Sequence, residues 1–466
     1  MSDNFGKNLT EGSVPRQLLS MAVPMLLANL LGTGYNIVDA IWIGRFVGKE
    51  GIGAVAVSFP VMFIFIGVAA GATMATTVLV SQFYGARNLA MVAKSVGTSF
   101  TISIALSVVS ATGGMFAAAD ILRLLNTPPE VFPLAVSYLR ITFLSFPVLY
   151  MTFLVTSILR GVGDTKTPLY FMTAGVALNA LLDPLMIIGI GPFPRLGLDG
   201  AAWATLISSA VGMTLGVMYL RRKGSVLVTG VKWFALDPYI TKLIVKIGFP
   251  SMIQQSAVAL GIAAVTSFVN SFGAAAIAAF GAGGRVDSIA FLPAQSIGLA
   301  VSAISGQNIG AGRYDRINSI FKWGVLMTIS ITLTFSALFV AIPGVLLAPF
   351  TTDPDVIAIG SGYLRIAGPP ITFFAVMFVS NGIINGAGHT LTTLIFTLIA
   401  VWGIRVPLAA LLSRSSLGIN GVWLSYAIGF FTTMCISLCW YRSGRWKKAV
   451  IKHDPNYVAE PPDAPL

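Results

Sequence analysis

Long apolar stretches separated by short polar segments run through most of the chain, from about residue 17 to residue 441. An α-helix needs about 20 mostly apolar residues to cross a bilayer, and these stretches reach that length. They are continuous rather than alternating at every second position, so they do not fit the strands of a membrane β-barrel. The pattern predicts twelve spanning helices, near residues 17–44, 53–80, 94–119, 132–159, 168–190, 200–221, 241–269, 275–304, 318–342, 358–385, 391–412 and 418–441.

The first half of the chain is repeated in the second half, about 225 residues later. Tyr-Leu-Arg-Ile at 138–141 recurs at 363–366, and the spaced motif Gln-x-x-Gly-Ala at 82–86 recurs at 307–311. Leu-Gly-Leu-Asp-Gly, which ends at Gly200, returns as a motif that ends at Gly421. Each copy holds six spans, an even number, so both copies insert in the same orientation. Two such halves are related by a pseudo-twofold axis along the membrane normal.

The predicted fold is therefore an all-α integral membrane protein with two six-helix lobes and a substrate path between them. We expect an amino-terminal lobe over residues 1–220, a cytoplasmic linker over 221–240, a carboxyl-terminal lobe over 241–445 and a cytoplasmic tail over 446–466. Duplicated membrane units of this kind are typical of transporters whose halves move around a central site.

Composition and charge support a membrane location. The mean hydropathy is +0.84, and 10% of the residues are charged, against about 25% in a soluble domain. Placing the amino terminus in the cytoplasm puts 20 of the 29 Lys and Arg on the cytoplasmic side, five outside and four within spans. This asymmetry follows the positive-inside rule and explains the net charge of +12. It predicts a membrane protein with both termini cytoplasmic, and it argues against nucleic acid as a partner.

Two acidic residues within the amino-terminal half are the principal candidates for function. Asp39 lies on the first span about six residues before its outer end, and Asp183 lies on the fifth span about seven residues before its outer end. At 1.5 Å per residue both lie roughly 10 Å below the outer boundary. Because ionisable side chains inside a span cost several kcal/mol, each one needs a reason.

Further oxygen-bearing groups are expected at the same depth. Asn179 is one turn from Asp183, and Tyr35 is one turn from Asp39. Thr205, on the sixth span, lies one turn after Ala201, whose backbone carbonyl is a further candidate ligand. Carboxylate, amide, hydroxyl and carbonyl oxygens suit a small cation such as Na⁺, or a proton shared by two nearby acids. The sequence leaves the choice between proton and sodium open.

The alternative is that the two acids only hydrogen-bond neighbouring helices. The repeat argues against this, because a structural requirement should persist in both copies, and the second copy has no acid at these places. Asp39 corresponds to Ala264 or Val265, Asp183 to about Val406, and Thr205 to about Tyr426.

Pro24, fifteen residues before Asp39, favours a kink in the first span, but its repeat partner Pro250 makes a purely structural kink equally plausible.

The second half contributes fewer polar candidates. Asp287 and Arg285 are expected to form a local charge pair in the eighth span with a mainly structural role. No embedded His, Cys–His pair or metal-binding set is evident, so an enzyme is not expected, and neither is a cofactor other than the coupling ion.

These motifs resemble those of the multidrug and toxin extrusion (MATE) family over essentially the whole chain. The Gln-x-x-Gly-Ala repeats, the pattern from Tyr35 to Asp39 and the position of Pro24 are similar to its DinF-like prokaryotic branch. The resemblance implies that Asp39, Asn179, Asp183, Thr205 and the Ala201 carbonyl couple export to an ion gradient, and that Tyr35 and Pro24 take part in rearranging the first span. The NorM-like branch relies on second-lobe acids, including a Glu in the seventh span, where this chain has Gln254 and Gln255.

The expected function is that of a monomeric secondary antiporter, which exports amphipathic, often cationic compounds in exchange for H⁺ or Na⁺ by alternating access. Its substrates would be held mainly by packing against apolar side chains, and Met172, two turns before Asn179, is a candidate contact. The alternative is a flippase for lipid-linked oligosaccharides of the same superfamily.

Overall fold

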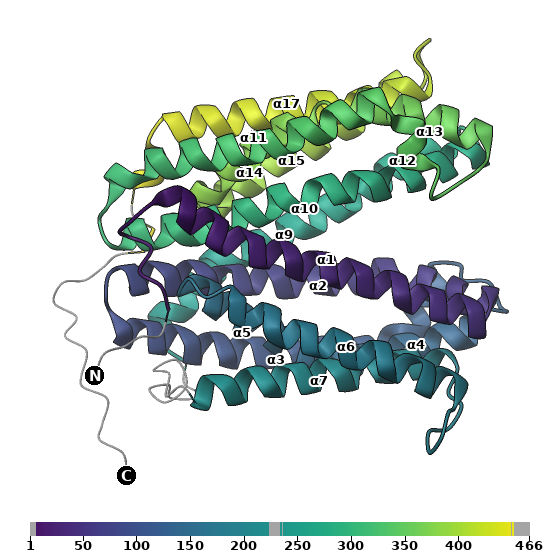
Figure 1. Ribbon diagram of the computed structural model, residues 1–466, viewed down its shortest axis with the longest axis horizontal. Helices are drawn as coiled ribbons and strands as arrows, with labels where there is room; N and C mark the ends of the chain where they lie inside the picture. The colour runs from purple at the N-terminus through teal and green to yellow at the C-terminus, as the bar shows by residue number, and fades with distance from the viewer. Residues whose placement is uncertain (1–5, 223–233, 235, 449, 452–466) are drawn as a thin grey trace. The chain divides into compact units, whose positions relative to one another are not determined.

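The computed structural model describes residues 6–222, 234, 236–448, 450 and 451, and over these residues the chain is helical with no strand. The first half forms α1 (Val14–Phe46), α2 (Lys49–Gly85), α3 (Leu89–Leu124), α4 (Phe132–Leu144), α5 (Phe146–Gly161), α6 (Lys166–Ile188) and α7 (Leu198–Arg222). The second half forms α9 (Pro238–Asn270), α10 (Ala274–Gly310), η1 (Tyr314–Arg316), α11 (Ile317–Ala341), α12 (Pro343–Leu347), α13 (Pro354–Ala367), α14 (Ile371–Gly386), α15 (Thr390–Leu398), η2 (Ile399–Arg405), α16 (Val406–Leu412), α17 (Ile419–Arg442) and η3 (Arg445–Lys447) (Figure 1).

Twelve spans are present when each bent helix pair is counted as one. Among the described residues ten helices are long and apolar enough to cross a membrane, and two helix pairs pass the same test together. The pair α4–α5 bends by 45° and the pair α13–α14 by 49°. Pro147 follows the first bend, and Pro369 with Pro370 occupies the second. Proline lacks an N–H donor and clashes with the preceding turn, which explains both breaks. The predicted all-α fold of twelve spans is confirmed.

The helices divide into two compact units, which we call the first and the second unit. The first holds residues 24–245, and the second holds residues 8–23 and the described residues from 246 onward. The start of α1 therefore belongs to the second unit, and the start of α9 belongs to the first. The lobe boundaries predicted at residues 220 and 241 fall between apolar segments, because hydropathy does not say which bundle the start of a helix packs against. They therefore did not predict that the starts of α1 and α9 pack in the opposite units. Most of the expected linker and tail lies outside the described residues.

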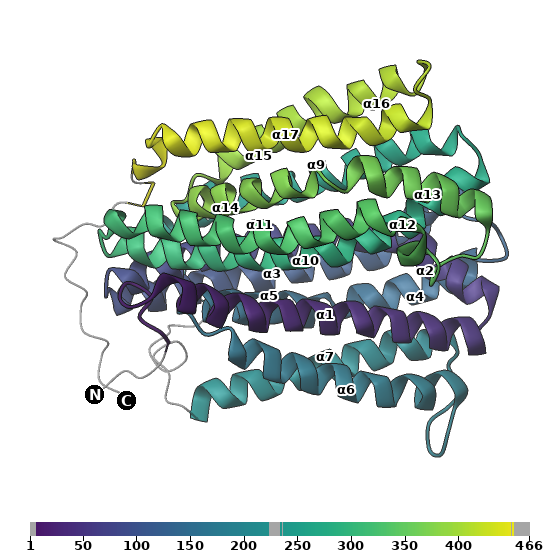
Figure 2. The same ribbon diagram turned by 45° about the horizontal axis from the view of Figure 1, so that its top comes forward.

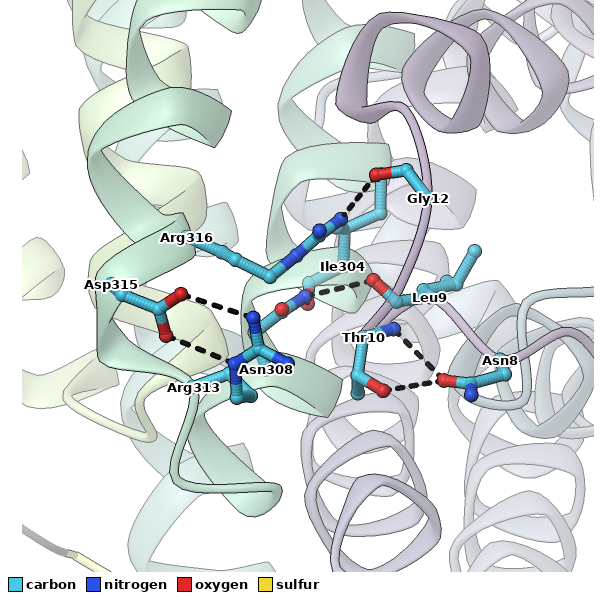
Figure 3. A network of polar contacts seen from close by, with 9 residues as sticks. All are labelled: Asn8, Leu9, Thr10, Gly12, Ile304, Asn308, Arg313, Asp315 and Arg316. Carbon is cyan, nitrogen blue, oxygen red and sulfur yellow. Dashed lines mark hydrogen bonds and ion pairs between the residues drawn. The ribbon is translucent and has the colours of Figure 1, made fainter.

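Side chains of the second unit hold the segment before α1 by hydrogen bonds to backbone atoms of that segment (Figure 3). The N–H of Leu9 donates to Gln307 Oε1 at 3.0 Å, and Asn308 Nδ2 donates to the Leu9 carbonyl at 3.0 Å. Arg316 Nη2 donates to the carbonyl of Gly12, also at 3.0 Å. Leu9 is 1% exposed, so its backbone groups are satisfied by protein rather than by water. These contacts explain why this stretch groups with the second unit.

Small residues let the helices of the second unit approach closely. A Cβ atom on Gly382 of α14 would lie 2.6 Å from the carbonyl oxygen of Gly298 on α10. A Cβ atom on Gly386, one turn later, would lie 2.5 Å from the carbonyl oxygen of Ser302. Such contacts replace the hydrophobic driving force that is missing between helices in lipid. In the same unit, α17 packs alongside α15 and α16 (Figure 2).

We predict that Gly382→Ala lowers the melting temperature of the protein in detergent, because the new methyl group cannot fit beside the Gly298 carbonyl without moving α14. The cost of such overpacking is about 1–3 kcal/mol. The control is Gly281→Ala on α10, where a Cβ meets nothing within 4 Å and alanine should stabilise the helix by about 0.5–1 kcal/mol. Equal melting temperatures for the two variants would contradict this account of helix packing.

Candidate functional site

Four of the five residues predicted to couple transport to an ion lie on the α6–α7 hairpin of the first unit: Asn179, Asp183, Ala201 and Thr205. Gly200, in the first turn of α7, sets its geometry, because a Cβ atom there would lie 2.5 Å from the carbonyl oxygen of Met186 on α6. The close approach aligns the two helices along their length (Figure 1). Gly421 has the same role in the second unit, where a Cβ would lie 2.6 Å from the carbonyl oxygen of Leu412. The repeated five-residue motif is thus explained by packing in both units.

α1 joins the hairpin through a tyrosine. Ile43, two turns beyond Tyr35, is 1% exposed in the apolar core of the first unit. The Tyr35 hydroxyl lies 2.6 Å from Thr205 Oγ1 on α7, and Thr205 Oγ1 donates to the carbonyl of Ala201 at 3.0 Å. Because a threonine hydroxyl has one hydrogen, Tyr35 must be the donor to Thr205. The result is a directed chain of two hydrogen bonds from α1 into α7.

The two acids lie close enough for their charges to interact. Asp183 is fully buried on α6, and its Oδ1 accepts a hydrogen bond from Asn179 Nδ2 at 3.2 Å. Asp39 lies on α1 one turn after Tyr35, whose hydroxyl reaches Thr205 of the hairpin, and its carboxylate is within electrostatic range of Asp183. The structure therefore brings the carboxylates of Asp39 and Asp183 into one neighbourhood, together with the Tyr35–Thr205 pair.

Three oxygen atoms in this neighbourhood are buried and have no hydrogen-bond partner. They are Oδ1 of Asp39, Oδ1 of Asn179 and Oδ2 of Asp183. All three are acceptors, so what the cluster lacks is a donor or a cation. Buried polar atoms without a partner are rare, and each one calls for an explanation. Two carboxylates and an amide oxygen can take up a proton or coordinate a small hard cation such as Na⁺. Among the described residues no three or more His, Cys, Asp or Glu side chains gather as a metal site.

Two details differ from the sequence analysis. The Ala201 carbonyl is not a free oxygen, because it accepts the Thr205 hydroxyl. The expected charge pair of Asp287 with Arg285 is wrong: Asp287 Oδ2 accepts a hydrogen bond from Tyr363, and the Arg285 guanidinium lies 5.9 Å from the ring centre of Phe350. Residues two apart on a helix point in different directions, so the two side chains reach different neighbours.

The remaining predicted residues lie apart from the polar cluster. Pro24 is buried within α1, which continues through it as one helix, and the residue marks the point where α1 passes from the second unit to the first. Met172 packs beside Leu159 and Phe171 in a small apolar cluster of the first unit. Both positions are compatible with roles in movement or substrate contact, and those roles stay predictions.

The sequence analysis missed Tyr138 as a site residue. This tyrosine of α4 is 8% exposed, and it lies within electrostatic range of Asp39 and Asp183. Its repeat partner Tyr363 donates a hydrogen bond to Asp287 in the second unit. The repeated Tyr-Leu-Arg-Ile motif thus places a tyrosine in contact with Asp287 in the second unit and within electrostatic range of the two acids in the first. The repeat could have identified this residue. A tyrosine that is retained in both copies of an apolar span is expected to have a polar neighbour in each copy.

Comparison with known families decides what kind of protein carries this site. The family model MatE matches the chain twice, over residues 24–185 and over residues 250–411. The two matches cover more than half of the chain, and they begin at the paired prolines Pro24 and Pro250. The chain belongs to the MatE family. Members of this family are transporters rather than enzymes, and this MatE protein is accordingly a multi-pass membrane protein.

Several named relatives extend over nearly the whole of this MatE protein. The probable multidrug resistance protein YoeA of Bacillus subtilis is 32% identical over 443 residues, 94% of this chain and 96% of that protein. The probable multidrug resistance protein NorM of Thermotoga maritima is 27% identical and covers 96% of this chain and 97% of its own. A crystal structure of MATE in the straight conformation aligns with a TM-score of 0.86 at 23% identity, over 94% of this chain and 97% of that one. This likeness confirms the fold.

We predict that Tyr35 and Thr205 are energetically coupled. The free energy of unfolding should be measured for the wild type, Tyr35→Phe, Thr205→Ala and the double variant. Hydrogen bonds between spanning helices contribute about 0.6 kcal/mol on average, with a maximum of about 1.7, so a coupling energy in this range is expected. Additive effects of the two substitutions would show that the hydrogen bond contributes nothing to stability.

Proposed function

We propose that this protein is a secondary active multidrug efflux antiporter, which exports amphipathic, often cationic compounds in exchange for a proton or a sodium ion. The observation that carries the proposal is the group of buried acceptor oxygens on Asp39, Asn179 and Asp183, which lack a donor. The names of the relatives from Bacillus subtilis and Thermotoga maritima support the class of substrate.

The coupling ion would bind where repulsion between the two acids is strongest. A proton or Na⁺ at this place removes the cost of holding two negative charges together. Asp39 lies on α1, whereas Asn179 and Asp183 lie on α6, so the ion would draw α1 toward α6. The hydrogen bond from Tyr35 to Thr205 joins α1 to α7 at the same place. An ion changes the balance between two conformations only if it binds one of them more tightly.

Pro24 offers a way for α1 to respond to the ion. The residues before it belong to the second unit and those from it onward to the first. Proline removes one backbone hydrogen bond of the helix, which lowers the cost of a bend there. We therefore propose that α1 bends at Pro24 when ion occupancy changes, while the anchored start of the helix stays with the second unit. Alternating access by the two units then exports the substrate.

Further assignments follow from the sequence and belong to the same proposal. The protein is proposed to lie in the plasma membrane of a prokaryotic cell with both termini in the cytoplasm, and the excess of Lys and Arg on one side supports this orientation. The protein is proposed to act as a monomer, with small amphipathic molecules and membrane lipid as partners and without nucleic acid.

We predict that Asp39→Asn abolishes gradient-driven efflux of a cationic dye from proteoliposomes, because the amide cannot take up a proton and binds a cation more weakly. The pH gradient and the sodium gradient should be imposed separately, and the one that drives the wild type identifies the coupling ion. Asp120→Asn is the matched control, since Asp120 is exposed and its ion pair with Arg123 is of a kind that contributes little.

Normal efflux by Asp39→Asn would refute the proposed coupling role. The flippase alternative predicts a different pattern in the same vesicles: neither gradient moves the dye, and a lipid-linked oligosaccharide crosses the bilayer. A continuous ohmic current in a planar bilayer would instead indicate a channel.

A further inference from the structure

The second unit contains a buried arginine that the proposed ion site does not use. Arg405 is 8% exposed and ends η2, a π-helical stretch between α15 and α16. Pro407 follows two residues later and cannot donate a backbone hydrogen bond to the preceding turn, which explains the wider turn here. Single π-helical turns inside α-helices are frequent at functional sites. An ionisable residue at such a place in a spanning segment needs a partner.

Aromatic rings, rather than a carboxylate, surround the guanidinium. Its Cζ lies 4.5 Å from the ring centre of Tyr426 and 4.6 Å from that of Phe430, both on α17. Such contacts stabilise the positive charge through the faces of the rings. They leave the N–H donors in the guanidinium plane unused, and Nε is buried without an acceptor. Over the described part of the chain, no acceptor engages the Arg405 side chain.

The nearby acid does not neutralise this cation. Asp287 accepts its hydrogen bond from Tyr363. The side chains that lie against the Arg405 guanidinium are Tyr426 and Phe430, and no ion pair joins Arg405 to a carboxylate of the described residues. A structural ion pair, the ordinary explanation for a buried arginine, is therefore missing among the described residues.

The repeat places this cation at the counterpart of the first unit's acid site. Asp183 corresponds to about Val406, the neighbour of Arg405, and Thr205 corresponds to about Tyr426. The two units thus carry an acid and an arginine at related positions, and Tyr426, the counterpart of Thr205, lies against the Arg405 guanidinium. A site that accepts a proton or cation in one unit has a counterpart that offers N–H donors to an anion in the other.

The surrounding helices hold Arg405 in place and leave room for it. A Cβ atom on Gly429 of α17 would lie 3.2 Å from Arg405 Nε, so glycine keeps this side of the guanidinium free. Trp402, one turn earlier on η2, donates from Nε1 to the carbonyl of Ala257 on α9 at 3.1 Å. The π-helical turn is therefore fixed at one side, and the guanidinium is oriented before any ligand arrives.

We propose that Arg405 is a specificity-determining residue of this transporter, which binds the carboxylate of amphipathic substrates through its unused N–H donors. The planar guanidinium fork matches the two oxygens of a carboxylate. This inference extends the proposed export function, and the measurement below separates the two because binding needs no ion gradient.

The test compares two forms of one fluorescent dye, a cationic xanthene that carries an ethyl ester and the same xanthene with the ester hydrolysed to the carboxylic acid. Fluorescence anisotropy of the purified full chain in detergent gives Kd for each. A charge-assisted hydrogen bond that is lost corresponds to about a tenfold weaker Kd or more. Arg405→Gln should therefore weaken binding of the acid by at least about tenfold and leave the ester within about twofold. Arg365→Gln, an exposed arginine of the same unit, is the matched control.

Two further variants keep the test decisive if Arg405→Gln does not fold. Arg405→Lys retains the charge without the planar fork and should lie between the wild type and the glutamine variant for the acid. Gly429→Ala crowds Nε and should selectively weaken the acid. Equal loss of both dyes in the Arg405 variants, or no loss of either, would show a structural arginine and overturn the proposal. A wild type that binds the ester far more tightly than the acid would overturn it as well.

Discussion

Water is excluded from the hydrocarbon core of a bilayer, so every polar atom on a spanning helix must find its partner within the protein. Most of this chain meets that constraint locally. Ser and Thr hydroxyls donate back to carbonyls one turn earlier, as Thr328 does to Gly324 and Thr332 to Thr328. The exceptions among the described residues include Asp39, Asn179 and Asp183 in the first unit and Asp287 and Arg405 in the second. Function is best sought at these exceptions.

Close helix packing makes the exceptions possible. Gly200 and Gly421 bring the backbones of neighbouring helices together at related places in the two units. In the first unit this packing fixes the spacing between α6 and α7, which carry most of the acid site. In the second unit Gly429 leaves space for a guanidinium. The same small residues thus stabilise the bundles and position polar groups that would otherwise be too costly to bury.

Because of the duplication the two units share equivalent helix positions, but they differ in their buried polar residues. Tyr138 and Tyr363 occupy equivalent positions, and each lies near a buried acid. Beyond these tyrosines the units diverge, with two acids in one and an arginine between aromatic rings in the other. The proposed ion site in the first unit and the proposed carboxylate site in the second require a mechanical connection between the two units. α1 provides one, since its anchored start belongs to the second unit and its acid-bearing part to the first.

The sequence by itself determined the membrane location, the twelve spans, the duplication and the family. These properties depend on the length and periodicity of apolar segments and on short motifs, all of which are local. It also placed Asp39, Asn179, Asp183 and Thr205 at one depth, because helical rise is constant along a span. Depth alone does not say which faces of different helices meet. Only the tertiary structure decided that Tyr35 reaches Thr205, that Asp287 turns to Tyr363 rather than Arg285, and that α1 belongs to both units. Such facts depend on rotation about helix axes and on packing between distant segments, which no single span encodes.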